Sequence, residues 1–198
     1  MSVIKILAFD PAMGVTGWSV LTTDLFNPID CTVTKFGSIK PAAVVSKVAF
    51  RDEVELYGRS TVSLGYLREQ VALLIEEHKP DYIAVEDTYL DPHRPTAYAS
   101  LLQWICAVKL ICREKYKKPL FLISTKTAKH AVTGKGSSGK LAIQEAILTN
   151  PNIKFRQKVD ATSTELTEHV ADSIAVGAGF IFEVLPGRDE ARMIGTAV

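Results

Sequence analysis

VIKILAFDP, residues 3–11, is the stretch of sequence that decides the fold. It is short, apolar and rich in β-branched residues, which predicts a central buried strand ending at Asp10 and Pro11. A second short apolar segment, YIAVE at residues 82–86, ends in Glu86 in the same way. A single carboxylate at a strand end is often only a turn residue. Two of them, at the sheet edge where active sites of open α/β folds collect, indicate a site.

The rest of the chain predicts a mixed α/β fold, a sheet flanked by α-helices. Strands are expected at 18–23 and 31–39, and the Pro- and Asp-containing loop between them indicates an antiparallel meander. A helix over 96–116 is apolar on more than one face, so it needs partners on two sides. The other expected elements are a strand at 120–123 and helices over 60–78, 127–132, 140–148 and up to Pro186, the last preceded by the capping pair Thr162 and Glu165.

Length and composition predict one compact domain over residues 1–186, followed by a polar C-terminal tail over 187–198. Lys5 interrupts the first apolar stretch, unlike a secretory leader, and the longest apolar stretch is about half of the ~20 residues that span a membrane. The three cysteines lack C-x-x-C spacing, so neither a disulfide framework nor a zinc site is expected. We therefore expect a cytoplasmic protein with no membrane partner.

The formal net charge of +1 hides an uneven distribution of charge. Residues 109–158 contain twelve Lys or Arg and two acids, and the remainder of the chain is acidic. Such a run can be an ordinary solvated helix face. Beside a carboxylate-rich site it also provides what a nuclease needs, because a basic surface holds phosphates while carboxylates hold metal ions.

A third candidate carboxylate lies in the last expected helix. Between Val170 and Val184 the only charged residues are Asp172 and Glu183, and the neighbours of Asp172 are small enough for close packing. An unpaired carboxylate there would be unfavourable unless it were neutralised or bound to a cation. Helical geometry places His169 on the same face as Asp172. A bland alternative, in which Asp172 only interacts with the helix dipole or a lysine, remains open.

Hard oxygen ligands from three elements favour Mg²⁺ or Mn²⁺ over zinc. Two such ions can activate a water molecule and stabilise the leaving 3′ oxygen of a phosphodiester. The metal ions would also reverse the local sign of an acidic site that must accept an anionic substrate.

Four blocks of sequence together resemble the RuvC family of Holliday junction resolvases, in family order over about residues 3–184. They are Ala8-Phe9-Asp10-Pro11 with Thr16-Gly17-Trp18, Pro80-Asp81-Tyr82-Ile83-Ala84-Val85-Glu86, Gly139-Lys140, and His169-Val170-Ala171-Asp172-Ser173-Ile174-Ala175. The resemblance implies an RNase H-like mixed β-sheet, in which a three-stranded antiparallel meander is joined by parallel strands. It also implies a homodimer that nicks four-way DNA junctions symmetrically with Mg²⁺ or Mn²⁺.

By the same resemblance, Asp10, Glu86, His169 and Asp172 are the metal-binding residues. Lys140 takes the place of a lysine near the scissile phosphate, and Tyr89 that of an aromatic residue that contacts unstacked bases. Lys135, in the same basic Gly-rich loop as Lys140, is expected to contact DNA phosphates. Two residues depart from the family pattern: Ala12 stands where the family often has Gly, and His169 stands where many members have Asp, although histidine occurs there too. The loop at 24–30 and the stretch 44–59 are longer than the compact family core.

The sequence leaves three alternative functions to compare with this interpretation. Residues 134–140 match G-x-x-x-x-G-K, but Leu141 replaces the required Ser or Thr and the loop follows a helical segment rather than a strand. A sugar-kinase or actin-like phosphotransferase opens with a similar strand and aspartate but usually needs two such domains. The third rival is a junction-binding protein that retains the nuclease fold without cleavage, against which the three retained acids argue.

Overall fold

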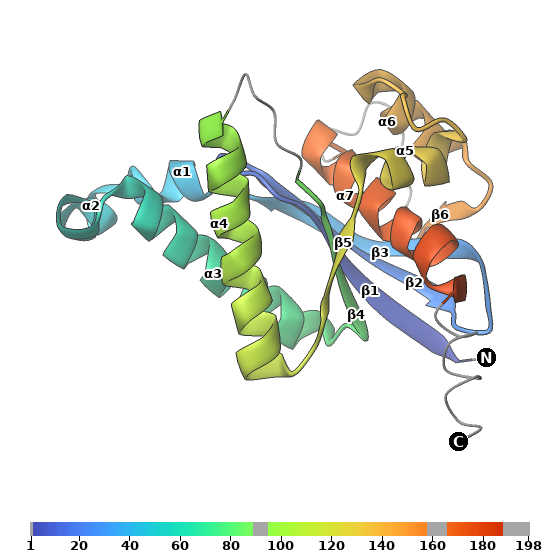
Figure 1. Cartoon of the computed structure of the whole chain (residues 1–198), viewed down its shortest axis with the longest axis horizontal. Helices are drawn as coiled ribbons and strands as arrows, with labels where there is room; N and C mark the ends of the chain where they lie inside the picture. The colour runs from blue at the N-terminus through green and yellow to red at the C-terminus, as the bar shows by residue number, and fades with distance from the viewer. Residues whose placement is uncertain (1, 89–94, 158–165, 188–198) are drawn as a thin grey trace.

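A computed structural model describes residues 2–88, 95–157 and 166–187 of the chain. Within these residues a six-stranded mixed sheet, in the order β5-β4-β1-β2-β3-β6, carries helices on both faces (Figure 1). The strands β1 to β3 form the predicted antiparallel meander, β4 and β5 continue the sheet parallel to β1, and β6 pairs parallel with β3. The strand bounds are β1 (Val3–Asp10), β2 (Thr16–Asp24), β3 (Asn27–Ile39), β4 (Tyr82–Glu86), β5 (Leu120–Ile123) and β6 (Ile153–Phe155).

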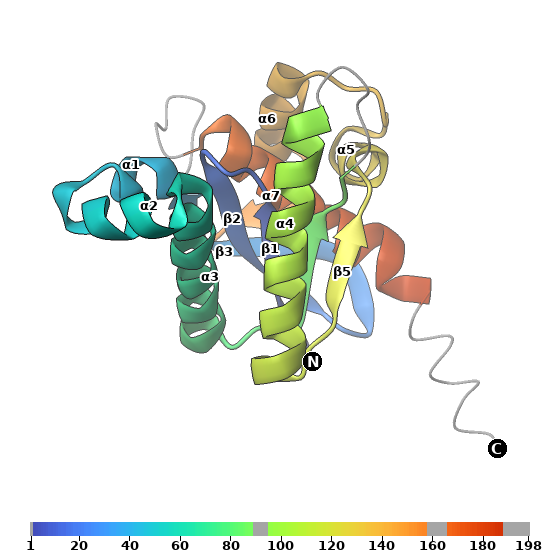
Figure 2. The same cartoon turned by 60° about the vertical axis from the view of Figure 1, so that its left-hand side comes forward.

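The helices form one layer on each face of the sheet, with α3 and α4 on one side and α5, α6 and α7 on the other (Figures 1 and 2). The shorter α1 and α2 lie beside the first turns of α3 and extend away from the sheet. The helix bounds are α1 (Pro41–Val45), α2 (Arg51–Tyr57), α3 (Arg59–His78), α4 (Pro95–Ile111), α5 (Thr125–Thr133), α6 (Lys140–Thr149) and α7 (Glu168–Gly179). Three single turns complete the elements: η1 (Val48–Phe50), η2 (Cys112–Tyr116) and η3 (Phe180–Val184).

Side-chain alternation along β1 divides the buried residues into two cores. Ile6 and Ala8 belong to the core under α5, α6 and α7, whereas Leu7 and Phe9 belong to the core under α3 and α4. Because the side-chain period of a strand is two, Asp10 continues the first series and points to the α7 side. The same alternation in β4 places Glu86 on that side.

The closeness of α7 to the sheet depends on glycines at two points. A Cβ atom on Gly17 would lie 1.9 Å from the backbone oxygen of His169, and one on Gly177 would lie 2.4 Å from Cδ1 of Leu21. Gly17 is also the register partner of Asp10 in the antiparallel pair β1–β2. The predicted close packing of this helix is therefore confirmed, and it brings the start of α7 directly over the end of β1.

Three details differ from the sequence-based expectation. β6 was missed because three residues are too few to show a period. The stretch after β3, to which no secondary structure was assigned, forms α1, η1 and α2. The last helix begins at Glu168, where the Thr167 hydroxyl caps the Val170 amide, whereas the proposed capping pair Thr162 and Glu165 falls outside the described residues.

The predicted two-sided character of α4 is seen in its burial. Trp104, Ile105 and Val108 are buried against the sheet, whereas Leu102 and Leu110 stay exposed. Within the described residues, Pro95–Tyr116 is also the one helix whose length and apolar composition would allow it to cross a membrane. In this structure one side of it covers the sheet, and the other side is left without a partner inside the described chain.

Candidate active site

The three predicted carboxylates lie together at the C-terminal edge of the sheet. Phe9 and Val85 are register partners in the parallel pair β1–β4. Asp10 and Glu86, the next residue of each strand, therefore lie side by side on the same face of the sheet. Asp172, from the second turn of α7, lines a cavity of about 230 Å³ together with Glu86. The structure thus brings together acids that lie up to 162 residues apart in the sequence.

Burial and the charges of neighbouring acids make Glu86 and Asp172 harder to ionise than free carboxylic acids. The pKa of Glu86 is raised to about 7, first by burial and then by the neighbouring charge of Asp10. The pKa of Asp172 is raised to about 6, first by burial and then by Asp10 and Glu168. A positive ion would relieve this repulsion, so the electrostatics of the site favour cation binding.

His169 is joined to the carboxylate cluster through Asp10. Its Nδ1 atom lies 2.6 Å from Oδ2 of Asp10, a hydrogen-bond distance. This hydrogen bond raises the pKa of His169, while partial burial acts in the opposite direction. His169 therefore holds Asp10 in place.

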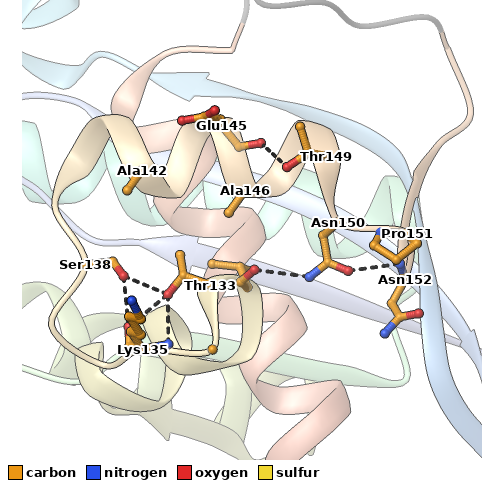
Figure 3. Close-up of a pocket in the computed structure, with 12 residues that line it drawn as sticks. Thr133, Lys135, Ser138, Ala142, Glu145, Ala146, Thr149, Asn150, Pro151 and Asn152 are labelled. Carbon is orange, nitrogen blue, oxygen red and sulfur yellow. Dashed lines mark hydrogen bonds between the residues drawn. The ribbon is translucent and has the colours of Figure 1, made fainter.

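The two predicted phosphate-binding lysines occupy different cavities. Lys140, the first residue of α6, lines the carboxylate cavity and forms an ion pair with Glu168. Lys135 lines a separate cavity of about 640 Å³ between the α5–α6 loop, α6 and residues 150–152 (Figure 3). In that loop the Thr133 hydroxyl bonds to the Lys135 carbonyl and to Ser138, which fixes the loop that leads to Lys140. Of these two lysines, Lys140 lies beside Glu86 and Asp172 and Lys135 does not.

Sequence reasoning missed three residues near the acids. Thr125 forms a hydrogen bond to Glu86 that lowers the pKa of that acid, and Lys129 acts on Asp172 in the same direction. Both residues line the carboxylate cavity. Glu168 is the third, as the partner of Lys140. The available signal was the position of Thr125 just after β5, because the end of that strand lies at the same sheet edge. Tyr89 falls outside the described residues.

The donors at this site fit a hard divalent cation. The three carboxylates are oxygen ligands of the kind expected for Mg²⁺ or Mn²⁺, and the imidazole of His169 suits Mn²⁺ better than Mg²⁺. Within the described residues, no three His, Cys, Asp or Glu side chains converge closely enough to hold an ion as they stand. Coordination of one ion by three of these side chains would therefore need side-chain rotations.

Comparison with known proteins gives the family. A family model described as crossover junction endodeoxyribonuclease RuvC matches residues 6–178. The chain belongs to this family. Proteins of that name from Petrotoga mobilis and Gloeobacter violaceus are 33% and 27% identical to it, over 86% and 92% of this chain and 88% and 91% of their own.

Solved structures agree on the fold. Thermus thermophilus RuvC superposes with a TM-score of 0.67 at 15% identity, covering 93% of this chain and 97% of its own. The same protein in complex with a Holliday junction substrate gives a TM-score of 0.64. The predicted RNase H-like architecture is confirmed. Nucleases of this family generally depend on divalent metal ions, which agrees with the donors present.

The G-x-x-x-x-G-K match is explained by the same structure. Residues 134–139 connect α5 to α6, whereas the phosphate loop of nucleotide hydrolases follows a strand. The loop is therefore a helix–helix connection that positions Lys140.

Proposed function

We propose that this protein is a structure-selective endodeoxyribonuclease that resolves four-way DNA junctions by symmetric, metal-dependent phosphodiester hydrolysis. The observation that carries the proposal is the convergence of Asp10, Glu86 and Asp172 at one sheet edge in a chain of the RuvC family. A junction-binding protein without catalysis would keep these acids at a cost in stability and for no use. An actin-like phosphotransferase is disfavoured by the family match.

Asp10, Glu86 and Asp172 would hold the metal ions, two per site, with His169 as a further ligand or as an acceptor of the attacking water's proton. When bound, the ions supply an activated water molecule and stabilise the leaving 3′ oxygen. The chain's own contribution is positional and electrostatic. His169 holds Asp10, and Thr125 holds Glu86 through its hydroxyl.

Lys140 supplies the positive charge for the phosphate group that reacts. Its ammonium is exposed beside the carboxylate cavity and forms an ion pair with Glu168. An anionic phosphate would compete with Glu168 for this ammonium, so substrate binding would break the Lys140–Glu168 ion pair. Lys135 and Tyr89 are proposed to contact DNA outside the reacting phosphate.

The proposed assembly is a homodimer on branched DNA in the cytoplasm. An exposed stripe of Leu102, Cys106 and Leu110 follows one side of α4, and a symmetric partner would bury it. A dimer presents two sites related by a two-fold axis, as paired nicking requires. The three cysteines are free, which fits a reducing compartment.

A cleavage assay on a synthetic four-way junction tests the proposal, with linear duplex and flap DNA as controls. We expect Mg²⁺-dependent paired nicks in the junction alone. Asp10→Asn, Glu86→Gln and Asp172→Asn should each abolish cleavage and leave junction binding intact. Equal cutting of duplex and junction would overturn the junction selectivity, and full activity in any one variant would remove that residue from the site.

A further inference from the structure

A third cavity, of about 310 Å³, opens on the other face of the sheet, between the ends of β2 and β3, α1 and α3. Its walls carry two partly exposed aromatic rings, Trp18 and Tyr66, and two exposed lysines, Lys40 and Lys47. Ser38 and Gln70 add hydrogen-bonding groups, and none of the described residues that line it is acidic.

The cavity is close to the catalytic edge of the sheet, which is the edge that carries Asp10 and Glu86. Trp18 is the register partner of Phe9, which directly precedes Asp10, and alternation turns the two side chains Trp18 and Asp10 to opposite faces. Ile39, at the end of β3, pairs with the first residue of β2 at this same edge and lines the cavity. A DNA strand leaving the carboxylates has only to cross the edge of the sheet to reach it.

The local sequence builds this cavity in two ways. Gly37 lies opposite Trp18 on β3, and a Cβ atom there would come within 2.9 Å of the indole ring. The missing side chain lets the ring lie across the neighbouring strand. The chain after β3 then adds the wall formed by α1 and, just after it, Lys47.

The chemistry of the lining selects a nucleotide. Aromatic rings stack on bases, lysines hold phosphates, and amide and hydroxyl groups can bond to base edges, which is the combination found in single-strand binding sites. The volume is near the lower end of the range for small-ligand cavities, roughly 300–1,000 Å³, so it suits one nucleotide and excludes a duplex.

We propose that this cavity binds one unstacked nucleotide of the DNA strand that crosses the catalytic edge of the sheet. The proposal rests on the proposed function only in that the strand belongs to a branched DNA. Trp18 and Tyr66 contact the base, and Lys40 and Lys47 contact its phosphates. The cavity thereby extends the DNA-binding surface onto the α3 face and favours junctions with unpaired bases near the crossover.

Tryptophan fluorescence tests the proposal without relying on cleavage. The chain has two tryptophans, and Trp104 is fully buried at 0% exposure, so an added ligand can change the emission of Trp18 selectively. We expect pentathymidylate, in EDTA and low salt, to quench the wild-type emission saturably. Free thymidine monophosphate keeps only its own phosphate and lacks those of neighbouring nucleotides, so it should bind at least tenfold more weakly. Equal affinity for the two ligands would show that the cavity binds a mononucleotide rather than a strand, and would overturn the proposal.

Matched variants locate the binding site. Tyr66→Leu and Lys47→Gln should each raise the Kd at least fivefold, whereas Tyr66→Phe, which keeps the ring, should stay within twofold. Tyr57→Leu, on the exposed part of α2, and Lys117→Gln, outside the cavity, are controls that should also stay within twofold. Tyr66 packs near Phe50, so Lys47→Gln serves as the decisive variant if Tyr66→Leu fails to fold.

The outcomes separate this proposal from the proposed function. No quenching at any concentration, or equal Kd values for cavity variants and controls, would overturn the cavity proposal even if the wild type cleaves junctions. Saturable binding that depends on Lys47, in a protein that cuts no junction, would support the cavity and overturn the nuclease. On an active enzyme, Lys47→Gln should raise KM and leave kcat within twofold.

Discussion

His169 and Asp10 are 159 positions apart in the sequence, yet His169 Nδ1 lies 2.6 Å from Asp10 Oδ2. This contact ties the first turn of α7 to the end of β1 and fixes one oxygen of a proposed metal ligand. It also gives His169 a defined role at the site, because His169 holds Asp10 in place.

Substitution of His169 tests its role in holding Asp10. His169→Ala should strongly reduce cleavage, because Asp10 loses its hydrogen-bond partner and the site loses a donor, whereas His169→Asp should keep appreciable activity with weaker dependence on pH. The Asp10 contact raises the pKa of His169, so wild-type activity at limiting metal should begin to fall above the usual histidine range as pH decreases. The measurement is single-turnover cleavage against pH in Mg²⁺ and Mn²⁺. Wild-type rates in His169→Ala with both metals would leave a three-carboxylate site.

The stability of the metal-free protein should depend on pH. The folded pKa values of Glu86 and Asp172, about 7 and about 6, exceed their ordinary values of 4.5 and 3.8. The folded chain therefore keeps protons that the unfolded chain releases, and the free energy of unfolding falls as pH rises through this window. We expect a loss on the order of 2 to 4 kcal/mol between about pH 4 and pH 8. Urea unfolding in EDTA measures it; Asp10→Asn should flatten the dependence and Mg²⁺ should reverse the loss.

Lys140 and Lys135 should differ in what their removal changes. Lys140→Ala, beside the acids, should lower the cleavage rate at saturating enzyme, since it removes the charge next to the reacting phosphate. Lys135→Ala, in the separate cavity, should weaken junction binding and reduce its salt dependence by about one unit, with the saturated rate unchanged. Single-turnover rates and binding at several salt concentrations distinguish the two. An unchanged rate for Lys140→Ala would make it an ordinary surface lysine.

Gly17 should be far less tolerant of a side chain than Gly14. A Cβ on Gly17 would clash with the His169 backbone at 1.9 Å, whereas at Gly14 no atom lies within 4 Å. Gly17→Ala must displace the start of α7, with an expected loss of at least about 1–3 kcal/mol and of metal affinity. Gly14→Ala is the control and should change stability by less than about 0.5 kcal/mol. Thermal unfolding and Mn²⁺ titration measure both, and similar behaviour of the two variants would contradict the close packing seen here.

The outer stripe of α4 should control assembly. Leu102→Glu and Leu110→Glu place charges on an exposed apolar face and should convert a micromolar dimer to monomers, while Leu73→Glu, exposed on α3, should not. Sedimentation velocity with and without junction DNA provides the measurement. A wild-type monomer under both conditions would argue against paired nicking by a dimer.

The two strand-end acids and the small-residue helix could be found in the sequence because each depends on local pattern. A strand shows its period within a few residues, and an acid in an otherwise apolar helix stands out by its desolvation cost. The meander, the parallel strands and Asp10, Glu86 and Asp172 followed from these local signals together with the family resemblance. The order of the blocks also allowed His169 and Lys140 to be proposed as members of the same site.

Other features were decided by the tertiary structure alone. The His169–Asp10 hydrogen bond, the Thr125 contact to Glu86 and the separation of Lys135 from Lys140 depend on how α7, β5 and α6 pack on the sheet. The raised pKa values have the same origin, because burial and charge proximity are properties of folded distances rather than of neighbours along the chain. The nucleotide-sized cavity beside Trp18 arises likewise from the meeting of β2, β3, α1 and α3, which no single segment encodes.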